Sequence, residues 1–219
     1  MLMLGISTSS RSPSAAVMRD GAVLSFETDE SGSSHSAALM ALIESALKNA
    51  GVSKTELDAI AVDIGPGSFT GVRIGVSCAN AMAFALGVGT VPVCSLAALR
   101  HAAKGEGTVV ALLDARNGNG YAAAYNKEQE LLAPCPCVIN DILASYPKDS
   151  AEYVGDAAEV CTKALPDALL VLKEANSMLL SGEIKLAERM SDSTDTSAVR
   201  PSEAVPLYLR PSQAERMKG

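Results

Sequence analysis

The chain of 219 residues has no tryptophan, only two histidines, and few aromatic side chains, which make up 4% of its residues. Neither histidine, His35 or His101, belongs to an HExxH-type helical pair. A catalytic metal site built mainly from histidine is therefore excluded. The scarcity of aromatic rings also removes the stacking platforms that RNA-binding proteins use for unpaired bases.

Positive charge is scarce as well. Lys and Arg number 18 against 25 Asp and Glu, which gives a formal net charge of -7 and an isoelectric point near 4.9. Proteins that bind nucleic acid need clustered basic side chains to displace counterions from phosphates, and the sequence has no such cluster. The composition argues against a protein that binds nucleic acid by itself.

Long hydrophobic runs are missing. The longest stretch without a polar side chain, Ala81 to Gly89, is far shorter than the roughly 20 residues that span a bilayer. The apolar start, Met1 to Ile6, has neither the length nor the basic flank of a signal peptide, and it predicts a first strand. We therefore expect a soluble, cytoplasmic protein with no membrane partner.

Cysteine occurs in a pattern that predicts neither disulfides nor a metal clip. The five cysteines are odd in number and form no CxxC pair, and the nearest two, Cys135 and Cys137, match no common zinc or thioredoxin spacing. The chain is also much larger than a disulfide scaffold. We expect buried, reduced thiols.

What is present is the composition of a globular protein, 48% apolar and 20% charged, long enough for one large domain or two small lobes. Met1 to Thr8 and Ala15 to Arg19 are predicted strands, and Asp20-Gly21 is typical of a type I′ hairpin turn before a third strand. Apolar residues at helical spacing predict a helix over residues 39–50, which Gly51 would end. Asp58 to Ile64 then predicts a further strand.

The next segment carries almost no charge, since Arg73 is the only charged residue from Ile64 to Leu99. Two apolar stripes at helical spacing predict a helix that Gly87 ends. A helix that is apolar on two sides needs two neighbours. We therefore expect this segment to be enclosed either in the core or against a partner.

The second half resembles the first, which suggests an internal duplication. Strands are predicted over residues 108–114, 121–126 and 131–139, after the pattern of residues 1–28. Farther along we expect helices at 156–165 and 176–190, a strand at 169–172, a loop at 191–198 and an extended piece at 206–210.

The motif Gly65-Pro66-Gly67, between a predicted strand and a predicted helix, has two interpretations. Glycines at a helix start let backbone N–H groups approach a phosphate, and Gly65, Gly67 and Ser68 would then face an anion. The segment lacks the Lys of a Walker motif, however, and Thr70 stands where a dinucleotide motif needs glycine. The alternative is a tight turn whose glycines allow close packing, with Ser68 or Thr70 as the helix cap.

Two further turns are candidates for facing a nucleotide or an anion. Ser7 and Thr8 offer hydroxyls after the first strand, but their turn has no carboxylate to position a metal or a water. Asp114 and Arg116 form the matching turn in the second half and do carry charges. With two histidines in the chain, no Ser-His-Asp or Cys-His set can be assembled. We therefore assign no catalytic residue and no metal ligand.

The run from Ile64 to Gly75, with the strand residues before it and the helix residues after it, closely resembles the signature of the bacterial TsaB (YeaZ) family. His35-Ser36, Asp114-Ala115-Arg116 and Tyr208-Leu209-Arg210 stand in the expected order. The resemblance is strong over residues 1 to about 125 and thin beyond them. Members usually carry Asp where this chain has Ser7.

This resemblance implies an α/β protein with the actin-like, Hsp70-like and sugar-kinase-like (ASKHA) fold, in two duplicated lobes. We expect lobes at 1–100 and 101–205, with the tail at 206–219 packing back on the first. The resemblance also implies a non-catalytic subunit in the biosynthesis of N6-threonylcarbamoyladenosine (t6A) at position 37 of tRNA. Its partners would be the catalytic TsaD protein and the TsaE ATPase, with tRNA bound only indirectly. No peptidase activity is expected, because TsaD holds its metal with a His pair that this chain lacks.

The weakly charged helices, about 36–50 and 71–86, supply the expected contact with TsaD or with a second copy of the chain. The expected contact residues are Leu39, Met40, Ile43, Leu47, Val72, Arg73, Val76 and Asn80. No cofactor is assigned, although weak nucleotide binding stays open. The rival interpretation is an active phosphotransferase or ATPase of the same fold that uses the Gly65–Gly71 loop and Asp114.

Overall fold

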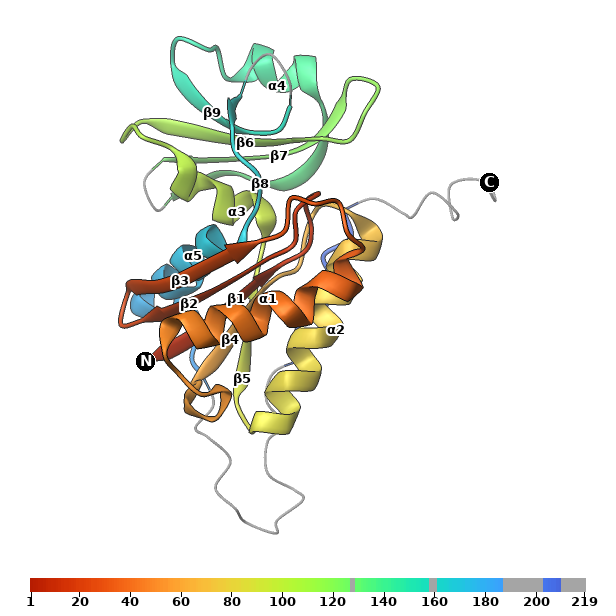
Figure 1. Ribbon diagram of the computed structural model, residues 1–219. Coiled ribbons are helices and arrows are strands. Elements are labelled where there is room, and N and C mark those ends of the chain that lie inside the picture. Colours follow the sequence, from red (N-terminus) through yellow and green to blue (C-terminus); the bar gives the residue numbers. More distant parts are fainter. Residues whose placement is uncertain (127–128, 158–160, 187–202, 210–219) are drawn as a thin grey trace.

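A computed structural model of the chain describes residues 1–126, 129–157, 161–186 and 203–209, which form two α/β lobes (Figure 1). The first lobe is built on a five-stranded sheet of order β3-β2-β1-β4-β5 and the second on a five-stranded sheet of order β10-β9-β6-β7-β8. Read from β8 to β10, the second sheet repeats the first, because each has a central strand between an antiparallel hairpin partner and a parallel strand. The prediction of two duplicated lobes with the ASKHA fold is confirmed.

Four strands of the first sheet match predicted strands, whereas the fifth, β5 (Gly89–Val93), was not predicted. Its hairpin turn has positive φ at both Asp20 (50°) and Gly21 (81°), as a type I′ turn requires. Helices α1 and α2 each end at a glycine in the left-handed conformation, Gly51 and Gly87. The elements are β1 (Leu2–Ser7), β2 (Ser14–Arg19), β3 (Ala22–Thr28), α1 (His35–Ala50), η1 (Lys54–Glu56), β4 (Ala59–Asp63), α2 (Phe69–Leu86) and β5 (Gly89–Val93).

Helices cover both faces of the first sheet. Leu2, Leu4 and Ile6 alternate to one face and pack with α1 and α2, while Met3 faces the other side. That other side is covered by α3 (Ser95–Leu99) and by α5 (Ala168–Ser181), a helix from the second half of the chain. The same core continues into residues of the second sheet, so the two lobes share buried apolar contacts.

Helix α5 differs from the prediction for this part of the chain. Residues 169–172, predicted to be a strand, form its first turns, and the helix predicted at 176–190 begins at Ala168 and ends at Ser181. The cap explains the start, because the Asp167 side chain accepts a hydrogen bond from the N–H of Leu170. A short apolar run is ambiguous between strand and helix, and burial of this run against β1 decides for the helix.

The second lobe contains a further correction. The helix predicted at 156–165 does not form, because Thr162–Lys163 is strand β10, paired in parallel with β9. Residues 158–160 lie outside the described residues. The elements are η2 (Arg100–Ala102), β6 (Thr108–Asp114), β7 (Asn119–Asn126), β8 (Gln129–Val138), α4 (Ile139–Ser145), β9 (Ala151–Gly155) and β10 (Thr162–Lys163).

The end of the described chain returns to the first lobe. The N–H of Leu207 donates to the carbonyl of Ile64 at 2.8 Å, so residues 203–209 lie beside α2. The loop predicted at 191–198 falls outside the described residues. Because α5 also packs on the first sheet, we propose that the first lobe includes α5 and residues 203–209 in addition to residues 1–100.

Helix α2 is long and apolar enough to count, by length and composition alone, as a weak candidate membrane span. Its contacts are those of a core helix, since Val72, Val76, Ala79 and Ala83 are buried against the sheet. Packing against β4 therefore explains why one side of α2 is apolar.

Candidate functional site

A cleft of about 790 Å³ lies between the two lobes, where the turns after β1, β4 and β6 meet. Of the residues predicted to face a nucleotide or an anion, Gly67, Ser68 and Asp114 line this cleft. His35 also lines it, and its Nε2 lies 2.8 Å from the carbonyl oxygen of Ser10. The structure thus brings the first and second halves of the predicted site together.

Ser7, Thr8 and Gly65 do not face the cleft, which corrects their predicted place. Ser7 and Thr8 are fully buried, and the Thr8 hydroxyl donates to the carbonyl of Gly71 at 2.7 Å. Gly65 is buried, and its carbonyl accepts from the N–H of Ser95. These three residues hold the turns together and are not available to a ligand.

Asp63 is not among the predicted site residues, yet it organises these turns. Its carboxylate is fully buried and accepts hydrogen bonds from the hydroxyls of Ser7 (2.8 Å) and Ser95 (2.5 Å), from the hydroxyl of Ser9, and from the N–H of Gly65 (3.0 Å). The Ser7 turn therefore does have a carboxylate beside it in space. Asp63 itself does not line the cleft, but its hydrogen-bond partner Ser9 does.

Burial raises the pKa of Asp63 above its usual 3.8, against the opposing effect of these hydrogen bonds. A raised folded-state pKa means that the contribution of Asp63 to stability is full below about pH 3.8 and falls as the pH rises through the folded-state value. Asp63→Asn cannot titrate, so we expect it to gain stability relative to the wild type as the pH rises toward neutral. Asp63→Ala, which leaves the buried donors without their acceptor, should lose about 3 kcal/mol.

Urea unfolding of both variants at mildly acidic and at neutral pH measures these differences. A relative loss of stability by Asp63→Asn on going to neutral pH would mean that the folded state prefers the charged carboxylate. The pKa of Asp63 would then be lowered, contrary to our expectation.

Gly67, just before α2, and Gly71, in its first turn, allow close packing. A Cβ on Gly71 would lie 2.0 Å from the carbonyl oxygen of Thr8, and one on Gly67 would lie 2.6 Å from the carbonyl oxygen of Ser9. Ser68 caps α2, because its side chain accepts from the N–H of Gly71 at 3.2 Å. The N–H of Ser68 donates to the carbonyl oxygen of Ser9 at 2.7 Å. Several donors that a phosphate would use are thus bound within the protein, which favours the packing interpretation.

On the second lobe, Asp114 is exposed, but its turn is held internally. Its carboxylate accepts from the N–H of Arg116 at 2.7 Å, and its own N–H donates to Asp156 at 2.8 Å. Burial raises the pKa of Asp156, and the neighbouring charge of Asp114 adds to this effect. In the described part of the chain, no group of three or more His, Cys, Asp or Glu side chains is arranged to hold a metal ion.

The predicted partner residues divide sharply by exposure. Most of them pack in the core of the first lobe: Leu39, Ile43, Leu47, Val72 and Val76 are all at most 8% exposed. They face the protein's own sheet, so a partner cannot touch them without unfolding the lobe. Met40, at 48% exposed, is the apolar residue of the predicted set that reaches the surface.

The outward side of α2 carries exposed residues that the periodicity did not separate from the core. Phe84 is 76% exposed, and Ala81 and Arg73 lie on the same side of the helix. The half-buried Cys78 joins the two helices, with its sulfur 3.7 Å from that of Met40 and 4.0 Å from that of Met82. We call Met40, Ile74, Cys78, Ala81, Met82 and Phe84 the α1–α2 surface. Its thioether and thiol groups are polarisable and adapt to an opposing surface.

Arg73 and Asn80, the remaining predicted partner residues, hold the end of the described chain. Asn80 exchanges two hydrogen bonds with the backbone of Ala204, at 2.9 and 3.0 Å. Arg73 donates to the hydroxyl of Tyr208 at 2.8 Å, and its guanidinium lies 4.1 Å from the centre of the Phe69 ring. Residues 203–209 thus border the α1–α2 surface along one edge.

The family model described as TsaD, tRNA N6-adenosine threonylcarbamoyltransferase, matches residues 29–154, which is more than half of the chain. The tRNA threonylcarbamoyladenosine biosynthesis protein TsaB of Escherichia coli K12 is 26% identical over 96% of this chain and 95% of its own length. TsaB of Bacillus subtilis is 34% identical over 67% of this chain and 64% of its own.

Solved structures show the same relationship. YeaZ from Pseudomonas aeruginosa superposes with a TM-score of 0.72 at 28% identity, covering 95% of this chain and 99% of that one. A second Pseudomonas aeruginosa structure, described by its similarity to peptidase YeaZ, gives a TM-score of 0.75 at 26% identity over the same shares. The similarity therefore extends through both lobes.

Proposed function

Because this chain belongs to the TsaB (YeaZ) family and has a role in the biosynthesis of tRNA N6-threonylcarbamoyladenosine, we propose that it is the non-catalytic scaffold of the modifying complex. In this role it binds the catalytic TsaD-like subunit and holds it in its competent state. A TsaE-like ATPase joins the pair. The setting is the cytoplasm.

The observation that carries this proposal is the α1–α2 surface. Its residues are apolar or sulfur-containing, and from Ile64 to Leu99 the only charged side chain is Arg73. Large exposed apolar side chains on a protein surface mark an interaction site, and Met40 and Phe84 are 48% and 76% exposed. Two relatives that match nearly the whole chain are named for the same modification, which supports a TsaD-like protein as the occupant. Without that partner, a second copy of the chain takes its place.

Contact with tRNA is assigned to the partner. The net charge of -7 and the 4% aromatic content of this chain oppose tight binding of a phosphate backbone. Mixing the purified chain with the TsaD-like protein of the same organism, followed by light scattering on the separated species, tests the association. A mixture that gives only the two separate proteins would count against the proposal.

We expect the purified chain to show no peptidase activity and negligible ATPase activity. Asp63 is sealed inside a set of hydroxyl donors, and the turn of Asp114 is engaged by Arg116 and Asp156. Steady-state ATP and peptide hydrolysis assays measure this, with Asp114→Ala as the paired variant. ATP turnover at a rate typical of enzymes, abolished by Asp114→Ala, would reverse the assignment.

That reversal would favour the rival function, a phosphotransferase of the ASKHA type. The observation on its side is the interlobe cleft, whose volume of about 790 Å³ accommodates a nucleotide and whose wall includes Asp114, Asp156 and Arg116. The scaffold remains the better-supported function, because backbone N–H groups at the start of α2 already donate hydrogen bonds within the protein.

A further inference from the structure

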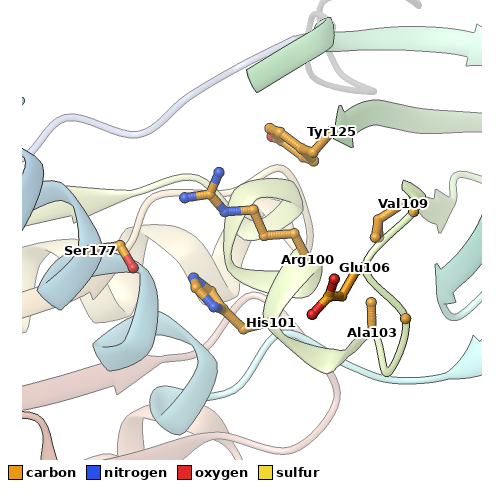
Figure 2. A pocket seen from close by; sticks show the side chains of 9 residues that line it. Arg100, His101, Ala103, Glu106, Val109, Tyr125 and Ser177 are labelled. Carbon is orange, nitrogen blue, oxygen red and sulfur yellow. The ribbon is translucent and has the colours of Figure 1, made fainter. Parts of the chain in front are cut away.

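A second pocket, of about 450 Å³, lies where η2, the loop after it, β7 and α5 meet (Figure 2). It shares no lining residue with the interlobe cleft. Arg100 and His101 come from η2, Tyr125 from β7 in the second lobe, and Ser177 from α5 on the first. The pocket therefore lies at the junction of the two lobes, and a molecule bound there would touch both.

A buried ion pair fixes one wall of this pocket. Glu174 on α5 is 4% exposed and accepts from Nε of Arg100 at 2.9 Å, while Nε2 of His101 lies 2.7 Å from the same carboxylate oxygen. This contact holds the guanidinium by its Nε edge. In the part of the chain that the structure describes, the two terminal nitrogens of Arg100 have no hydrogen-bond acceptor. They are free to bind a ligand in the fork geometry that suits a carboxylate.

Tyr125 supplies a second polar group that lacks a hydrogen-bond partner among the described residues. Its side chain is buried, at 4% exposed, yet its hydroxyl has no hydrogen-bond partner among the described residues. The guanidinium carbon of Arg100 lies 5.4 Å from the centre of its ring. Burial raises the pKa of Tyr125, so the hydroxyl keeps its proton and can donate. Buried hydroxyls are nearly always paired, which makes this one a marker for an absent acceptor.

The charges of the other residues that line the pocket limit which kind of ligand could supply that acceptor. Glu106 is exposed, and its carboxylate lies across the pocket from α5 and Ser177 (Figure 2). Glu174 already balances Arg100, so Glu106 leaves the pocket with an excess negative charge. A multiply charged anion such as phosphate is disfavoured there. A ligand that carries a carboxylate at one end and an ammonium at the other matches both groups.

We propose that this pocket binds a small zwitterion of the free amino acid type. Its carboxylate is held by the terminal nitrogens of Arg100 and the hydroxyl of Tyr125, and its ammonium by Glu106. Because the lining comes from both lobes, the bound molecule ties η2 and α5 to β7. Its binding stabilises the relative placement of the lobes by mass action. This site stands independently of the scaffold role.

Thermal unfolding of the full chain with a panel of free amino acids at millimolar concentration tests the proposal. Acetate, ethylamine and inorganic phosphate serve as single-charge and multiply charged probes. We expect at least one amino acid to raise the melting temperature in a dose-dependent way, with the three other probes ineffective at the same concentration. Stabilisation by phosphate alone, or by no amino acid, would overturn the proposal.

Variants separate specific binding from a general solvent effect. Tyr125→Phe and Glu106→Gln should each weaken binding of that amino acid by about tenfold, the loss of one good hydrogen bond or charge contact. Tyr146→Phe, the same change elsewhere in the second lobe, should leave binding unaltered. Without ligand, Tyr125→Phe should be at least as stable as the wild type, because it removes an unpaired hydroxyl. Unchanged affinity in both pocket variants, or destabilised ligand-free Tyr125→Phe, would contradict the site.

Discussion

Phe84→Glu should leave the chain folded and abolish the proposed association with the TsaD-like protein. Phe84 is 76% exposed on α2, so a charge there is solvated in the free protein and changes its stability by no more than about 0.5 kcal/mol. In the complex the same charge would be buried in an apolar contact without a partner. That placement costs several kcal/mol, which corresponds to a loss of affinity of about a hundredfold or more.

Two variants make the comparison specific. Leu180→Glu changes another exposed apolar residue, 80% exposed, on α5 at the opposite face of the first sheet. It should leave association intact. Val76→Glu, on α2 but only 4% exposed, should unfold the first lobe, since it buries the charge in the monomer itself. Circular dichroism and light scattering on the three variants separate these outcomes, and normal association by Phe84→Glu would remove α2 from the interface.

The second large effect concerns the reaction. If the chain holds the catalytic subunit in its active arrangement, leaving it out of a reconstituted system reduces threonylcarbamoyl transfer to background. A scaffold achieves this through contacts that it makes better with the competent state than with other states. Phe84→Glu should reproduce the omission, and Leu180→Glu should behave as the wild type, because the effect passes through the α1–α2 surface.

Much of the first lobe could be predicted from the sequence, namely β1 to β4, α1 and α2, whereas β5 and α3 were not predicted. Its strands and helices are bounded by residues with a clear physical role, such as Asp20-Gly21 in the hairpin and Gly51 and Gly87 at the helix ends. Local signals of this kind need no knowledge of distant contacts. They also explain why the duplication was visible, since β6 and β7 repeat the pattern of β1 and β2.

The second half was less predictable because its elements depend on distant packing. The run at 169–172 is apolar on every side, and only its burial against the first sheet makes it helical. A Cβ on Gly5 would lie 2.6 Å from the side chain of Leu172, which shows how closely α5 approaches β1. Residues 162–163 form a strand through pairing with β9, which no local pattern indicated.

The candidate site was also only partly predictable, because it too depends on distant contacts. Periodicity found two apolar stripes on α2 but could not say which one the protein's own sheet covers, so Val72 and Val76 were assigned to a partner that cannot reach them. Asp63 could have been noticed as a lone carboxylate ending an apolar strand. Its hydrogen bonds to Ser7 and Ser95 join residues far apart in the sequence, and only the fold reveals them.

The most direct test measures threonylcarbamoyl transfer to tRNA together with tRNA binding, in a system reconstituted from the TsaD-like and TsaE-like proteins with and without this chain. The account predicts transfer only when the chain is present, and no tight binding of tRNA by the chain alone, as its net charge of -7 requires. Full transfer in its absence, or tight and salt-sensitive tRNA binding by the isolated chain, would contradict the account.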